Sequence, residues 1–236
     1  MSCSFPPGQL TAVMGASGSG KTSVLTAIPA LQAAGSRTCG QVLCNGMEVN
    51  MELMRHLVSA VPQEDVFLAA LSPREMWLGL SLKDVERCWC CMVLHAFPLK
   101  SSAPTRLAFA AELRCMRTLS PLDRQQRVSD ILQLLHIEKC ADTAIGDEKL
   151  GVRGISGGER RRLSVGLALI GGLPQVLLCD EPTSGLDSAA AANMVDVLKT
   201  IAKRGVTVVA AIHQRLGRAE FGWNWVVEAL KSFNFG

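Results

Sequence analysis

The chain has 236 residues, of which 48% are hydrophobic and 19% are charged, and its formal net charge is +3 at pH 7. This composition excludes a disordered chain, and the length suffices for one large domain or two small ones with a buried core. The small charge, with no dense basic tract beyond 160–162, argues against nucleic acid or a bare membrane surface as a partner.

Cysteine usage indicates the redox compartment of the chain, and hydropathy shows whether it contains a membrane span. The 9 cysteines are scattered, and no basic segment followed by a long apolar one opens the chain, so we expect a reducing compartment. A membrane helix needs about 18 apolar residues, and the nearest stretch, 167–179, is interrupted by glycines and a proline. We expect no membrane span in this chain.

A glycine-rich stretch follows the apolar run 10–14 and satisfies the pattern G-x-x-x-x-G-K-[ST], which predicts a strand, a phosphate-binding loop and a helix start. Its glycines let successive N–H groups face one anion, and the helix start adds a positive dipole end. We expect Lys21 to reach the β- and γ-phosphates of a nucleotide and Thr22 to hold Mg²⁺. The alternative is a glycine-rich turn before an ordinary helix. The stretch comprises Gly15, Ala16, Ser17, Gly18, Ser19, Gly20, Lys21, Thr22 and Ser23.

Three elements are expected next. The helix should run over 21–31 and be disturbed at Pro29, which lacks an N–H. The stretch 40–46 reads as a short strand that ends in an Asn-Gly hairpin turn. The stretch 57–63 reads as a strand that ends near Gln63, where a proline and polar residues follow.

The pattern then becomes helical, and we expect a helical subdomain over 64–154 inserted into an α/β core. Ser72 offers an N-cap with a proline and a capping-box glutamate behind it. Ser120 repeats the device before a helix whose apolar residues recur at 128, 131, 132 and 135.

Alternating helices and strands return after Gly158. We expect a helix over 160–170, a fully buried strand over 176–179, a helix over 188–203 that ends before Gly205, and a buried strand over 206–212. Strands and helices that alternate at these lengths predict a parallel sheet.

Two acids follow the buried strand 176–179. Asp180, at the carboxyl end of that strand, is placed to hold Mg²⁺, and Glu181 to take a proton from an attacking water. An apolar run that ends in Asp-Glu is often only structural. The presence of a phosphate loop in the same chain favours the catalytic interpretation.

A second anion site is expected where Ser156, Gly157 and Gly158 open a helix, since they supply a hydroxyl, flexible backbone and a helix N-terminus. The alternative is a plain N-cap serine with a loose turn. His213 ends the strand 206–212, where ligands bind in α/β folds, although a lone histidine is more often structural.

The order of these motifs resembles the nucleotide-binding domain of ATP-binding cassette (ABC) transporters. The residues of two motifs, 155–166 and the part of 179–188 that follows Glu181, are similar to those of the G subfamily, the White-type half transporters. The five motifs are 15–23, 61–63, 155–166, 179–188 and 212–214, and the resemblance covers most of the chain from 8 to 214.

The resemblance implies two cassettes that pair head to tail, as a homo- or heterodimer, and close over two ATP molecules. Lys21 and Thr22 of one cassette would then face Ser156 and Gly158 of the other. In the same way Gln63 would sense Mg²⁺ and couple to the transport domain, Asp180 would organise Mg²⁺ and Glu181 would be the general base. Asp187 would act across the interface, and His213 would contact the γ-phosphate.

The fold implied is a P-loop NTPase core, α/β with a mainly parallel sheet flanked by helices, plus the helical subdomain. The function implied is ATP binding and hydrolysis that power transmembrane transport, with the cassette on the cytoplasmic side of a membrane. The alternatives are a soluble ABC-type ATPase of translation or DNA repair, and an inactive truncated fragment that at most binds a partner.

The chain departs from the family in three places, so we expect one cassette over 1–236 that is incomplete at both ends. Only nine residues precede Leu10, so the N-terminal β-subdomain is largely missing, Phe5 is the sole upstream aromatic, and an edge of the sheet is expected to be bare. The stretch 77–106 is an atypical insertion, either a retained intron or a lineage-specific loop. After Gln214 no membrane domain follows.

Overall fold

The computed structural model describes residues 3–28, 40–49, 57–63, 120–146, 153–212 and 225–228. The chain divides into two compact units, the first formed by Met1–Gln63 with Pro174–Gly236 and the second by Glu64–Leu173. In the described residues the first unit carries all the strands, and the second carries helices.

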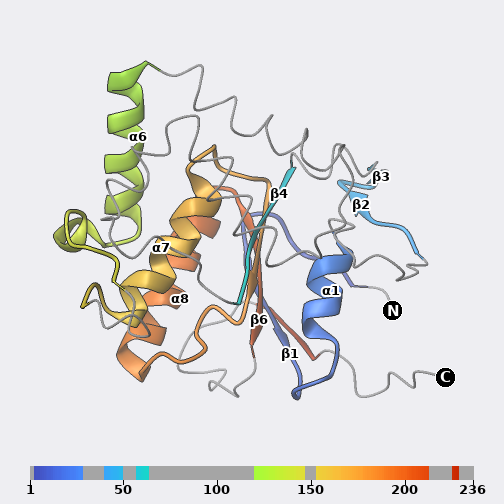
Figure 1. Ribbon diagram of the computed structural model, residues 1–236. Helices are drawn as coiled ribbons and strands as arrows, with labels where there is room; N and C mark the ends of the chain where they lie inside the picture. The colour runs from blue at the N-terminus through green and yellow to red at the C-terminus, as the bar shows by residue number, and fades with distance from the viewer. Residues whose placement is uncertain are drawn as a thin grey trace, which may run out of the picture. The chain divides into compact units, whose positions relative to one another are not determined.

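The first unit contains a five-stranded sheet in the order β4-β5-β6-β1-β7 (Figure 1). Each pairing between neighbours is parallel, and at the centre of the sheet Leu10 lies opposite Val208. The parallel α/β core predicted from the sequence is thus confirmed. The strands are β1 (Leu10–Met14), β4 (Val58–Val61), β5 (Val176–Asp180), β6 (Thr207–Ile212) and β7 (Trp225–Glu228).

Helices α1 (Lys21–Ala27) and α8 (Ser188–Lys203) lie on opposite sides of this sheet (Figure 1). Because both faces are covered, all six residues of β6 are buried, as expected for a central parallel strand. Helix α8 buries Met194, Leu198 and Ile201, whose spacing places them along one face of the helix.

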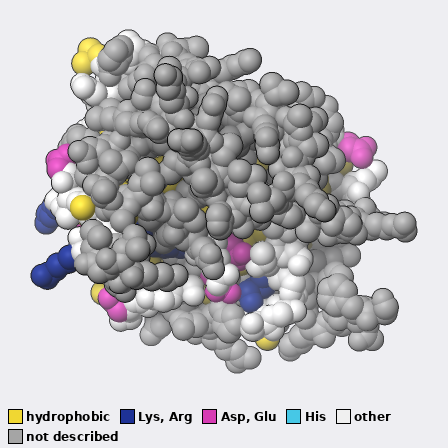
Figure 2. Space-filling view, in the orientation of Figure 1, with side chains coloured by type: hydrophobic (Ala, Val, Ile, Leu, Met, Phe, Trp, Pro, Cys, Tyr) yellow, Lys and Arg dark blue, Asp and Glu magenta, His cyan; other side chains and the backbone are white. Residues whose placement is uncertain are grey.

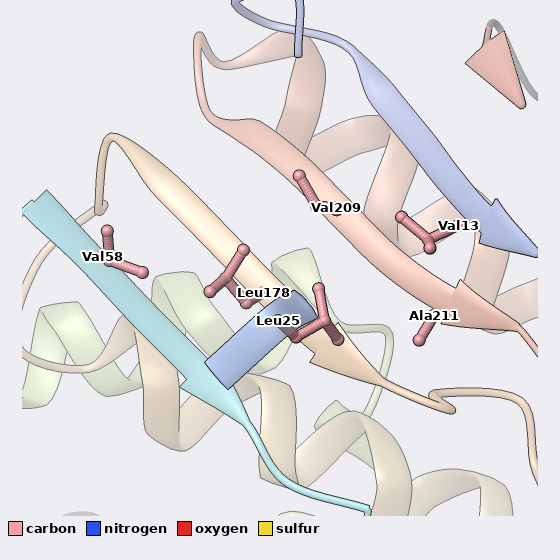
Figure 3. Close-up of a cluster of buried hydrophobic side chains, with 6 residues drawn as sticks. All are labelled: Val13, Leu25, Val58, Leu178, Val209 and Ala211. Carbon is pink, nitrogen blue, oxygen red and sulfur yellow. The ribbon is translucent and has the colours of Figure 1, made fainter. Parts of the chain in front are cut away.

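One hydrophobic cluster joins α1 to the sheet. Leu25 of α1 lies over β5, next to side chains from the four strands β1, β4, β5 and β6 (Figure 3). This packing sets the place of α1, and therefore of the phosphate loop before it, against the strand that ends at Asp180. The cluster consists of Val13, Leu25, Val58, Leu178, Val209 and Ala211.

Local sequence signals correctly predicted several helices and strands. Strand β1 and helix α8 have the predicted bounds. The predicted hairpin is present, with β2 (Leu43–Cys44) antiparallel to β3 (Met47–Glu48). Its turn residues Asn45 and Gly46 have φ values of 52° and 79°, the left-handed conformation that an Asn-Gly turn adopts readily.

Strand β7 was not predicted. It pairs with β1 in parallel, with Thr11 opposite Trp225, so β1 has a hydrogen-bonded neighbour on each side. Strand β1 is therefore an inner strand of the described sheet, and the expectation of a bare sheet edge stays a prediction.

The second unit contains α6 (Pro121–Leu134), the short 3₁₀ helix η1 (Glu138–Cys140) and α7 (Gly157–Leu169). Helix α6 begins directly after its N-cap residue Ser120, as predicted. Helix α7 begins at Gly157, three residues before the predicted start at 160, because a cap at Ser156 offsets the weak helix propensity of two glycines.

Some predictions lie outside the described residues. They are the disturbance at Pro29, the helix start at Ser72, the insertion 77–106 and His213. The bounds 64–154 of the helical subdomain also stay a prediction. In the ranges that the structure describes, no helix has the length and hydropathy of a membrane span.

Candidate nucleotide-binding site

The loop between β1 and α1 contains two glycines in a left-handed backbone conformation. Gly18 and Gly20 have φ values of 76° and 84°, which side chains with a Cβ rarely adopt. A Cβ at Gly18 would meet no atom within 4 Å, so backbone conformation rather than space calls for glycine there. All nine predicted loop residues, 15–23, lie in the described part of the chain.

Lys21, the first residue of α1, folds its side chain back over this loop. Its ammonium nitrogen donates to the carbonyl oxygens of Gly15 at 2.9 Å and Ala16 at 3.0 Å, and only 5% of the residue is exposed. The hydroxyl oxygen of Ser19 is buried and makes no hydrogen bond within the described residues. A buried cation and a buried hydroxyl in one loop fit a phosphate group.

Thr22 connects the loop to β5. Its hydroxyl donates to the Asp180 Oδ2 oxygen at 2.8 Å, across 158 residues of sequence. Asp180 is the last residue of β5, so the parallel sheet brings a carboxylate to the phosphate loop, as the sequence predicted.

Glu181 follows Asp180 in a left-handed conformation, with φ 47°. Its N–H donates to the Ala211 carbonyl oxygen of β6 at 3.1 Å, which continues the ladder for one residue while the chain turns away. The Glu181 Oε2 oxygen accepts a hydrogen bond from the Gln63 side-chain amide at 3.0 Å. For a residue other than glycine this conformation costs about 1–2 kcal/mol, so the surrounding contacts hold it in place.

These contacts define a phosphate-loop cluster of Lys21, Thr22, Gln63, Asp180 and Glu181, all in the first unit. The two oxygens of Thr22 and Asp180 are hard ligands of the kind that Mg²⁺ binds alongside nucleotide phosphates. Among the described residues no group of three His, Cys, Asp or Glu side chains is placed to hold a metal. The cluster therefore fits a cation that is bound together with a nucleotide, and does not form a metal cage of its own.

Ser156, Gly157, Gly158 and Glu159 form a signature cluster in the second unit, at the start of α7. The Ser156 hydroxyl accepts from the Glu159 N–H at 3.3 Å and donates to Glu159 Oε2 at 2.7 Å. The same Oε2 oxygen accepts from the Ser156 N–H at 2.8 Å. This is a complete capping box, in which serine and glutamate satisfy each other's N–H groups.

The surroundings of Glu159 affect two ionisations. Burial acts to raise the pKa of Glu159, but hydrogen bonds from Ser156, the neighbouring Cys140 thiol and the charge of Arg162 lower that pKa below its usual value. The thiol itself donates to the Ile137 carbonyl oxygen at 3.3 Å. Burial and the neighbouring Glu159 carboxylate raise the pKa of Cys140 to about 11. Glu159 is therefore ionised and Cys140 is a thiol at neutral pH.

Sequence reasoning treated Ser156 as a site residue but missed Glu159. The signal was present, because a glutamate three residues after a capping serine is the same capping-box pattern that predicts a helix start at Ser72. Asp187, predicted to act across an interface, accepts from the Ala190 N–H at 2.7 Å and caps α8.

Charge is mixed on the visible surface. On the face shown in Figure 2, basic and acidic side chains of the described residues are interspersed and form no single charged patch. This agrees with the small net charge of +3.

A family model described as ABC transporter matches residues 1–184, more than three quarters of the chain. The chain belongs to the ABC transporter family. Relatives of this ABC chain include ATP-binding cassette sub-family G member 8 of Homo sapiens, 36% identical over 207 residues, which is 88% of this chain and 26% of that protein.

Two other relatives are of the same kind. ABC transporter G family member 17 of Arabidopsis thaliana is 38% identical over 211 residues, 89% of this chain and 27% of that protein. Protein white of Drosophila melanogaster is 36% identical over 210 residues, 88% of this chain and 26% of that protein. The predicted resemblance to the G subfamily is confirmed, and the soluble ATPase alternative gains no support. This ABC chain spans about a quarter of the length of these relatives.

Proposed function

We propose that this chain binds and hydrolyses ATP as the nucleotide-binding domain of a G-type ABC transporter. The observation that carries the proposal is a pair of hydrogen bonds. Thr22 joins the phosphate loop to Asp180 at the end of β5, and Gln63 after β4 donates to Glu181 after β5. A phosphate loop, a metal-binding acid and a second acid beside an amide are the parts that ATP hydrolysis requires.

Each side chain has a task in this proposal. Lys21 binds the phosphates as a point charge, and Thr22 and Asp180 hold Mg²⁺, which neutralises charge on the phosphates. Gln63 orients the Glu181 carboxylate by its hydrogen bond of 3.0 Å, and Glu181 accepts the proton of the attacking water. Catalysis is then mainly positioning and charge stabilisation of the transferred phosphoryl group.

The signature cluster completes the site from a second cassette, where Ser156 and Gly158 contact the phosphate held by the first. Asp187 acts across the same interface, and His213 contacts the γ-phosphate. The relatives' membership of the G subfamily supports a transmembrane partner and a cytoplasmic-side position at a membrane.

The test is Glu181→Gln, which keeps the shape of the side chain and removes its basicity. We expect ATP turnover to fall by about 100-fold or more while ATP binding is retained, since loss of a general base costs about 10²–10⁴ in rate. The matched control is Glu48→Gln, the same change on the exposed strand β3, which should leave turnover unchanged. Turnover of Glu181→Gln at the unmutated rate would show that the base is assigned wrongly.

A further inference from the structure

The backbone of Glu181 is held on both sides. Its N–H donates to the Ala211 carbonyl oxygen at 3.1 Å, and its carbonyl oxygen accepts from the Ser184 N–H at 3.1 Å. The second bond closes a β-turn that has Glu181 at its first position and Pro182 at its second. Glu181 is thus the residue at which the parallel ladder ends and the turn begins.

Pro182 suits this turn for two reasons. Its ring fixes φ at about −65°, the value that the second position of a type I or type II turn requires. Its ring also clashes with the preceding residue when that residue is in the right-handed helical region. Pro182 is buried, so the ring is packed in place. Relaxation of Glu181 from its φ of 47° into the right-handed region is therefore opposed by the residue that follows it.

The side chain of Glu181 depends on this backbone conformation. Its Oε2 oxygen accepts a hydrogen bond from the Gln63 amide at 3.0 Å, and Gln63 lies after β4, in a separate segment of the chain. Because Cβ is bonded to the Cα atom about which φ turns, a change from positive to negative φ swings the carboxylate to a new position. The hydrogen bond to Gln63 is therefore tied to the left-handed form.

We propose that Pro182 is a positioning residue for ATP hydrolysis, which keeps the Glu181 carboxylate directed at the Gln63 amide. The inference rests on the proposed role of Glu181 as the general base. The hydrogen bond to Ala211 imposes the left-handed conformation, and Pro182 removes the right-handed alternative that competes with it. A base that is held in place before the water attacks loses no rate to misorientation.

Strand β5 carries a matched control at its other end. Pro174 is also buried, and it precedes the first residue of β5, Val176, by two positions. Pro182 follows the last residue of the same strand, Asp180, by two positions. Pro174→Ala therefore removes a buried proline ring beside the same strand, at the end that lies away from the phosphate-loop cluster.

The first experiment measures kcat and the dissociation constant for ATP in the purified full chain. We expect Pro182→Ala to lower kcat about 5- to 30-fold, the factor that corresponds to the free energy released when Glu181 leaves the left-handed conformation. The dissociation constant should stay within about twofold, because Lys21 and Thr22 still bind the phosphates and their metal ion. Pro174→Ala should change neither quantity. An unchanged kcat in Pro182→Ala, or equal losses of kcat in the two variants, would overturn the proposal.

A double-mutant cycle separates positioning of the base from general damage to the fold. Because Pro182 acts through the Glu181 carboxylate, Pro182→Ala should lower kcat no further in a Glu181→Gln background. A further loss as large as the one in the unmutated background would mean that Pro182 acts by another route, and would also overturn the proposal.

A third measurement needs no ATP turnover. Amide hydrogen exchange at Glu181, whose N–H donates to Ala211, should be faster in Pro182→Ala than in Pro174→Ala or in the unmutated chain. Equal exchange in all three proteins would refute the support of Glu181 by Pro182. This result stands whether or not the chain hydrolyses ATP, so failure of the positioning role is distinguishable from failure of the proposed function.

Discussion

The phosphate-loop cluster and the signature cluster are built in different ways. In the first, residues from three segments of the chain meet, and Thr22 contacts Asp180 across 158 positions. In the second, Ser156 and Glu159 are three positions apart and belong to one helix start. The first cluster depends on the parallel sheet, whereas the second is specified within four consecutive residues.

Because of this difference, we expect the two clusters to respond to different substitutions. A change in the core of the sheet should disturb the phosphate-loop cluster, because Asp180 and Glu181 follow β5 directly. The signature cluster should respond to changes at its own helix start and to its supporting side chains. Three measurements test this difference between the two clusters.

The largest effect is expected from Leu178→Ala. Leu178 is 2% exposed and packs in the cluster with Leu25, so removal of its side chain should lower the free energy of unfolding by about 2–5 kcal/mol. ATP binding should weaken as well, while amide exchange at Ser156 stays unchanged at low denaturant. Chemical denaturation and hydrogen exchange measure these effects, with Leu43→Ala, at a side chain that is 57% exposed, as the control. Faster exchange at Ser156 would contradict the independence of the two clusters.

The next effect is on nucleotide affinity. Lys21→Ala removes the ammonium group of the phosphate loop, and we expect ATP binding to the single chain to weaken by about 100-fold, the equivalent of two charged hydrogen bonds. Ser156→Ala should leave this affinity unchanged, since Ser156 is proposed to contact nucleotide on a partner cassette. Titration with a fluorescent ATP analogue at low protein concentration measures both. Equal losses in the two variants would show that one chain uses both clusters on the same nucleotide.

The smallest effect is a dependence on pH at the signature cluster. The folded-state pKa of Glu159 is lowered from 4.5, so its carboxylate contributes stability that is present at neutral pH and is lost as pH falls below that value. The groups that face it are the Ser156 hydroxyl, the Cys140 thiol and the Arg162 guanidinium. Protection of the Ser156 amide, corrected for intrinsic exchange, should therefore fall only below pH 4.5. Glu159→Gln should show no such step, and a step near neutral pH would indicate a different titrating group.

The sequence predicted those elements whose signals are local. A short apolar run before the glycines predicted β1, Asn45-Gly46 predicted a hairpin, and Gly205 marked the end of α8. It predicted the pairing of phosphate loop and acidic strand end as well, because parallel strands bring their carboxyl ends to one edge of a sheet.

What it could not predict depends on distant contacts. Strand β7 begins at Trp225 after a stretch without alternation, and it is a strand because β1 offers it an edge. The left-handed turn at Glu181 follows from the ladder to Ala211, and no residue type signals it. The proximity of the Cys140 thiol to the Glu159 carboxylate, which together with burial raises the pKa of the thiol to about 11, joins a 3₁₀ helix to another helix start, and sequence spacing does not encode it.

The place of β1 in the sheet has a consequence for synthesis of the chain. Both strands that pair with Leu10–Met14, β6 and β7, are made about 190 residues or more after it. At about 5–20 residues per second, this apolar segment waits roughly 10–40 seconds for its neighbours. The strand that leads into the phosphate loop is thus an apolar segment that stays without its pairing strands during this part of synthesis.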